Sequence, residues 1–161
     1  STNPKSNPMT DIVSYVEYYR RIATDHPEIN DFFMMDINEP LAALRSTIRY
    51  PALILTTLSG NFQAPNLDDI LDVVQGGFLL IDHPARQDDF QSETVAMDRM
   101  KRIGTQIIKT MLADYLGCQP LAVKAIPGFD INSVSYELIG PVFDNDFGVV
   151  FSYTVVGLTS I

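Results

Sequence analysis

The side chains best suited to acid–base chemistry are the two histidines. His26 and His83 each directly precede a proline, and His83 also follows Asp82. A carboxylate beside an imidazole is a general-base pairing, but neighbouring side chains on an extended segment point to opposite sides. Because the residue before a proline favours an extended conformation, we expect both histidines to lie in loops without a chemical role. If the chain is instead an enzyme or a small-molecule-binding domain, its pocket should be lined by Asp82, His83 and Tyr136.

The remaining reactive groups do not form a recognised site. Cys118 is the single cysteine, and it follows a predicted helix C-terminus, whose field does not favour a thiolate. Residues 144–146 (Asp-Asn-Asp) lack the spaced ligands of a calcium loop and read as a polar hairpin tip. Asp68, Asp69 and Asp72 have the spacing of a solvated helix start. We therefore predict no catalytic residues, no metal and no cofactor.

The composition describes an acidic globular chain. Of 161 residues, 46% are hydrophobic, and 11 basic residues stand against 20 acidic ones, giving a net charge of -9. This balance disfavours nucleic acid and anionic membranes as partners, because both are bound through clustered positive charge. No apolar run approaches the roughly 20 residues of a membrane helix. A lone cysteine cannot form an intrachain disulfide and fits a reducing compartment. The polar first residues and the absence of a linker predict a flexible tail at residues 1–10 and one domain over residues 11–161.

Three helices follow from the spacing of apolar residues. Spacings of three and four predict a helix over residues 11–24 and a second over residues 29–49, in one or two pieces around Pro40. The longest helix should cover residues 89–116 and end before Gly117. Its apolar stripe consists of Met97, Met100, Gly104, Ile107, Ile108, Met111 and Tyr115.

Five strands are predicted, at residues 50–58, 73–81, 121–126, 133–139 and 148–158. The paired glycines Gly76 and Gly77 indicate a bulge or a close backbone approach in the second strand. Turn-forming residues 140–147 join the last two strands in an antiparallel hairpin. Together these elements predict an α+β domain, with a mainly antiparallel or mixed sheet, helices packed on it and one long central helix.

This order of elements, with a closing aromatic strand after an acidic turn, resembles a family of particle proteins. The resemblance rests on residues 50–58, the long helix to Leu116 and residues 143–153 (FDNDFGVVFSY). In these segments the chain resembles the tail-terminator, or tail-completion, proteins of tailed phages and contractile injection systems. The resemblance extends over about residues 11–158. It implies a homo-oligomeric ring, usually a hexamer, that terminates the tail tube and meets sheath or neck proteins. It also implies assembly in the cytoplasm, a final place in the virion or injection particle, and no catalytic residues.

Charge placement indicates which surfaces such a ring would use. Basic residues gather on the long helix, whereas residues 125–161 contain acidic but no basic residues. We predict that the basic side chains of one copy meet the acidic hairpin of the next, a head-to-tail contact. The candidate residues are Arg99, Arg102, Lys109, Asp144 and Asp146.

Phe62, in the turn-rich segment 60–65, is an additional interface candidate. It either anchors a contact with a neighbouring subunit or the tube, or folds back onto its own core, and the sequence leaves both open. Two other functions also stay open. One is another head–tail connector or neck component, and the other is a small-molecule-binding domain or enzyme.

Overall fold

In the part of the chain that the structure describes, two α-helices pack against one mixed sheet of six strands. The computed structural model describes residues 12–35, 48–56, 58–68, 70–116, 128–143 and 145–158. The elements in chain order are α1 (Ile12–Asp25), β1 (Asp31–Met35), β2 (Ala52–Thr56), β3 (Ser59–Gln63), β4 (Leu71–Asp82), α2 (Phe90–Leu116), the short 3-10 helix η2 (Ile131–Ser133), β5 (Ser135–Val142) and β6 (Asp146–Leu158). The predicted α+β class is confirmed.

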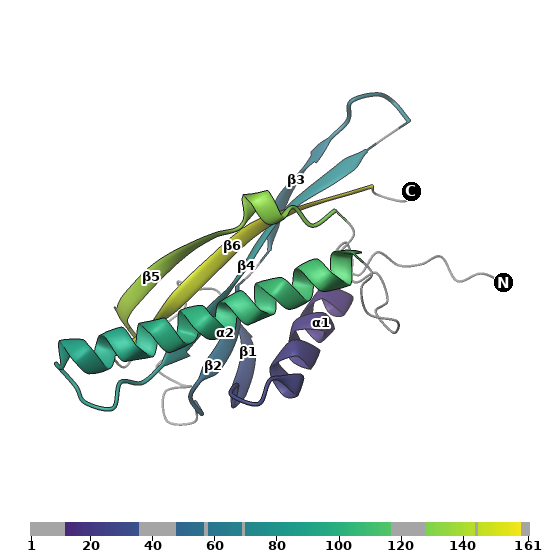
Figure 1. The fold of residues 1–161 in the computed structure, drawn as a ribbon. Coiled ribbons are helices and arrows are strands. Elements are labelled where there is room, and N and C mark those ends of the chain that lie inside the picture. Colours follow the sequence, from purple (N-terminus) through teal and green to yellow (C-terminus); the bar gives the residue numbers. More distant parts are fainter. Residues whose placement is uncertain are drawn as a thin grey trace.

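The strand order across the sheet is β1-β2-β4-β6-β5, and β3 pairs with the first part of β4 (Figure 1). β1 is parallel to β2, and the other pairs are antiparallel. The long strands β4 and β6 pair along their whole length, from Leu71 opposite Leu158 to Asp82 opposite Phe147. This central pair therefore fixes which residues meet at each end of the sheet.

Helix α2 confirms the long helix predicted from its apolar stripe. Asp89 caps its start, since the Asp89 carboxylate accepts hydrogen bonds from the Gln91 backbone N–H and the Ser92 hydroxyl. The stripe turns toward the sheet, with Met100, Ile103, Gly104, Ile107, Ile108 and Met111 all buried. Tyr115, included in the predicted stripe, is instead 40% exposed near the end of the helix.

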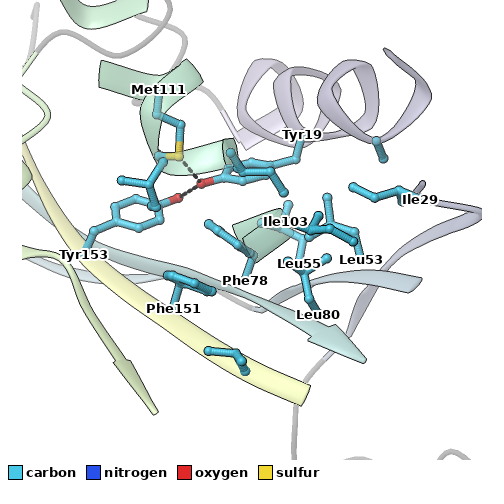
Figure 2. Close-up of a cluster of buried hydrophobic side chains, with 14 of the residues drawn as sticks. Tyr19, Ile29, Leu53, Leu55, Phe78, Leu80, Ile103, Met111, Phe151 and Tyr153 are labelled. Atoms are coloured by element: carbon cyan, nitrogen blue, oxygen red, sulfur yellow. Dashed lines mark hydrogen bonds between the residues drawn. The ribbon is translucent and has the colours of Figure 1, made fainter. Parts of the chain in front are cut away.

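The main core lies between the two helices and the face of the sheet that they cover, which we call the helix-side face. From β6 it receives Val149, Phe151, Tyr153 and Val155, the alternating set expected for one face of this strand. Figure 2 shows Phe151 beside Phe78 and, above them, Tyr153 pointing toward Tyr19. A smaller apolar cluster on the opposite face is built around Ala52, Ile54, Leu79 and Ile81.

The predicted helix over residues 29–49 is wrong at its start, where the chain forms strand β1. Phe32 packs against the main core, whereas Phe33 packs against the cluster on the opposite face. Alternation between two faces is the two-residue period of a strand, and its pairing with β2 satisfies the backbone. A helix would have placed both phenylalanines within one turn, on neighbouring positions of one surface.

Segment 60–65 is predicted as a turn-rich loop, but most of it forms strand β3. Gly60 and Phe62 pair with Val74 and Asp72 of β4. Gly76 and Gly77 mark close approach and not a bulge, since the β4–β6 register runs through them without a shift. A Cβ atom on Gly77 would lie 2.4 Å from the Phe151 carbonyl oxygen, which explains the glycine there.

Of the other predicted elements, some are confirmed and the rest lie outside the described residues. The helix predicted at residues 11–24 is α1, and the strands predicted at 50–58, 73–81, 133–139 and 148–158 are β2, β4, β5 and β6. The tail at 1–10, the strand at 121–126, and Cys118 and Asp144 fall outside the described ranges. Neither described helix is both long enough and apolar enough to cross a membrane.

Candidate functional site

Asp146 is the one charged residue that is completely buried among those the structure describes. Its Oδ1 atom lies 2.9 Å from His83 Nδ1, and its Oδ2 atom accepts a hydrogen bond of 2.7 Å from the Tyr50 hydroxyl. A buried carboxylate requires such partners, because burial without them is strongly unfavourable. The contact with Asp146 assigns the ring proton of His83 to Nδ1, which leaves Nε2 on the far side of the ring.

Strand register brings these three residues together. Asp82 opposes Phe147, so His83, one residue beyond β4, comes beside Asp146 at the start of β6. Ala52 opposes Ile81 in the β2–β4 pair, which places Tyr50 next to His83 on the other side. The Tyr50 and His83 rings lie 5.7 Å apart at an angle of 35°. The three residues therefore form a row across one end of the sheet.

This row agrees with the prediction for His83 and corrects the one for Asp146. As predicted, His83 lies in a loop and its side chain does not pair with that of Asp82; its ring instead contacts the distant carboxylate of Asp146. Asp146 was expected at an exposed hairpin tip in contact with another subunit, whereas it is fully buried inside its own chain. A side chain with no exposed surface makes no contact with a neighbouring copy.

A pocket of about 520 Å³ opens beside His83, between the end of β4 and the first turns of α2. Its ionisable lining residues are Asp82, His83, Arg86, Asp89 and Arg99. Tyr136, expected in this pocket, does not line it. Burial raises the pKa of the Asp82 carboxyl, and the His83 backbone N–H and Arg99 oppose this more weakly.

The basic face of α2 is already used in part within the chain. Arg102 donates two hydrogen bonds to the Glu28 carboxylate, at 3.2 and 2.8 Å. This pairing is the main reason that the pKa of Glu28 is lowered. Arg99 lies 3.5 Å from both Glu28 and Asp82. A second copy would therefore have to share these two guanidinium groups with acidic residues of the same chain.

The two lysines of α2, Lys101 and Lys109, are both exposed. Lys109 is exposed and makes no ion pair with the residues that the structure describes. Lys101 lies over the Tyr136 ring of β5, with its Nζ atom 4.8 Å from the ring centroid. Tyr136 and Leu138 are 53% and 51% exposed, so an apolar strip with a cationic border follows the β5 edge of the sheet. We call Lys101, Tyr136 and Leu138 the β5 edge patch.

A second exposed surface is a projecting arm, which consists of β3, the first half of β4 and the end of β6. Figure 1 shows the β3–β4 hairpin projecting from the body of the molecule, away from both helices. All five residues of β3 are exposed. Phe62 is 69% exposed, so it does not fold back onto the core, one of the two outcomes that its sequence left open.

No match was found when the sequence was compared with models of known protein families and with curated proteins. Within the described ranges, no three His, Cys, Asp or Glu side chains lie close enough together to hold a metal ion. The geometry of the chain itself is therefore the basis for assigning a role.

Proposed function

We propose that this chain is a structural subunit that assembles head-to-tail into a ring, and that the ring terminates the tail tube of a phage or contractile injection particle. The element order that resembles tail-terminator proteins supports this role. The observation that carries it is the projecting arm, which exposes a strand and an aromatic side chain with no cover in the described chain. Phe62 and Leu67, which are 69% and 101% exposed, both lie on this projection, and gathered exposed apolar side chains are typical of interaction surfaces.

The β5 edge patch is the surface that fits this arm. Phe62 supplies an aromatic anchor, and Tyr136 with Leu138 offers a half-exposed apolar strip to receive it. The charges agree, since residues 58–75 contain three aspartates and no basic residue, while Lys101 borders the strip. The arm of one copy would then lie on the β5 edge patch of the next.

A contact of this kind is heterologous, because the two partners use different surfaces. Repeating one heterologous contact produces either a closed ring or an open filament, depending on the rotation between copies. Tube termination requires the closed form. The partners of this ring would be the last tube layer and the sheath or neck proteins, and its place would be the mature particle.

Cysteine cross-linking tests the contact directly. In a Cys118→Ser background, one variant carries Gln63→Cys and a second carries Glu137→Cys, at exposed positions beside Phe62 and Leu138 that leave both of these side chains in place. Mixing the two with a short bis-maleimide should give a covalent dimer, and each variant alone should give far less, because only the mixture places both thiols at one interface. Thr24→Cys, on the exposed side of α1, replaces Gln63→Cys in the matched control. Equal cross-linking in the control, or none in the mixture, would contradict the proposed contact.

A further inference from the structure

We propose that the pocket beside His83 binds a small molecule carrying a phosphate or carboxylate group, held by His83, Arg86 and Arg99. This site is separate from the assembly surfaces, because its lining residues lie on β4, the β4–α2 loop and the first turns of α2. The inference does not depend on the ring, and it adds a binding function to the proposed structural one.

The acidic groups of the pocket are occupied by the chain itself. Asp89 caps α2 with both carboxylate oxygens, toward Gln91 and Ser92. Asp82 accepts from the His83 backbone N–H at 2.9 Å with one oxygen and faces Arg99 with the other. Neither carboxylate therefore needs a cation from solution.

The donors in the pocket, by contrast, have unused capacity. Arg86 is exposed and forms no ion pair within the described residues. Arg99 has only contacts of 3.5 Å with its two carboxylates, longer than the usual 2.7–2.9 Å or so of charge-assisted bonds. A ligand oxyanion between the two guanidinium groups would satisfy these donors.

His83 adds an oriented group to the same wall. Its Nδ1 atom is engaged by buried Asp146, its ring is packed against Tyr50, and its side chain is 33% exposed. No hydrogen bond from a described residue reaches Nε2. An imidazole ring can donate from both of its nitrogens, so Nδ1 can serve Asp146 while Nε2 offers a hydrogen bond to a ligand oxyanion.

The size and the remaining walls indicate more than a bare ion. A volume of about 520 Å³ lies within the range of ordinary small-molecule sites. Pro84, Val95 and Ala96 form a nonpolar side, against which the carbon skeleton of such a ligand would pack.

Histidine NMR provides the test, since the chain contains two histidines and one is an internal control. Inorganic phosphate and acetate are titrated separately, at constant pH and ionic strength, into the protein labelled at its imidazole carbons. His83 signals should shift in a saturable way, and those of His26, whose Nε2 contacts Gln106, should stay unchanged. A larger response to phosphate or to acetate identifies the preferred group.

Substitutions then assign the shift to the pocket. Arg86→Gln and Arg99→Gln should each weaken binding about tenfold, the usual scale for loss of a charge-assisted hydrogen bond. Arg21→Gln, an exposed arginine of α1, should leave binding unchanged. Because Arg99 also contacts Glu28, Arg86→Gln is the deciding variant if Arg99→Gln fails to fold. Equal or non-saturating shifts of both histidines, or unchanged affinity in Arg86→Gln, would overturn the proposal.

Discussion

At the residue scale, the row Tyr50–His83–Asp146 shows what a buried charge requires. Both oxygens of the Asp146 carboxylate are bound by side chains that lie just outside the ends of other strands, Tyr50 before β2 and His83 after β4. This row was not predictable from the sequence, because its members are 63 and 96 residues apart and each lies at the end of a strand. Once the antiparallel register is known, the row follows from it directly.

Removing one donor from this row should lower stability. Tyr50→Phe leaves a buried carboxylate oxygen short of a hydrogen bond, which typically costs about 1–3 kcal/mol. Urea unfolding of the variant measures the change in the free energy of unfolding. Tyr136→Phe removes a hydroxyl from a half-exposed ring and should change it by less than about 0.5 kcal/mol. Equal effects of the two substitutions would show that the Tyr50 hydroxyl does not support Asp146.

The tyrosines of the core predict the response to alkali. Tyr19 bonds to Tyr153 and to the Met111 sulfur (Figure 2). Tyr15 also bonds to Tyr153, at 2.6 Å. Burial raises the pKa of Tyr15 from 10.0 to about 12, and it raises those of Tyr19 and Tyr153 as well.

The folded chain therefore keeps these protons at a pH where the unfolded chain has released them. Stability should be unaffected below pH 10 and should fall as the pH rises above it, by up to about 1.4 kcal/mol per pH unit for each such tyrosine. Urea midpoints between pH 9 and pH 11 measure this slope. Tyr15→Phe should reduce the slope, and Tyr115→Phe, on the exposed end of α2, should not. If Tyr15→Phe left the fall of stability with pH unchanged, the raised pKa of Tyr15 would not be its cause.

At the element scale, long periodic segments were predictable and short ones were not. The apolar stripe of α2 and the alternation in β6 repeat often enough to identify a helix and a strand. β1 has five residues, and its alternation is hidden because the side chains on both of its faces are apolar. β3 contains Ser59, Gly60 and Asn61, which favour turns locally, and its pairing with β4 overrides that preference.

The close approach of α2 to the sheet gives a test of this packing. A Cβ atom on Gly104 would lie 2.1 Å from the ring of Phe151, which is itself stacked on Phe78. Gly104→Ala should therefore destabilise the chain by about 1–3 kcal/mol, although alanine is favoured over glycine in a helix by up to about 1 kcal/mol. Thermal unfolding checks the sign. Gly104→Ala should cost less stability in a chain that already carries Phe151→Leu than in the unchanged chain, because the smaller side chain leaves room for the added methyl group. If Gly104→Ala stabilised the unchanged chain, the described packing would be contradicted.

At the scale of the whole molecule, the class of fold was predictable and the distribution of charge was only partly so. The basic side of α2 was recognised, but Arg99 and Arg102 are paired with residues of their own chain. Ion pairs between segments distant in sequence are set by the fold, which sequence spacing does not reveal. For this reason we propose the projecting arm and the β5 edge patch, and not Arg99 and Arg102, as the assembly surfaces.

The most direct test of the proposed assembly is the mass of the particle in solution. Sedimentation velocity over a range of concentrations up to about 1 mM detects contacts as weak as about 4 kcal/mol. A ring built from head-to-tail contacts predicts a mass that rises with concentration and stops at one closed multiple of the chain, with Phe62→Ser shifting the rise to higher concentration. A single-chain mass at every concentration, or a rise that Phe62→Ser leaves unchanged, would contradict assembly through the arm.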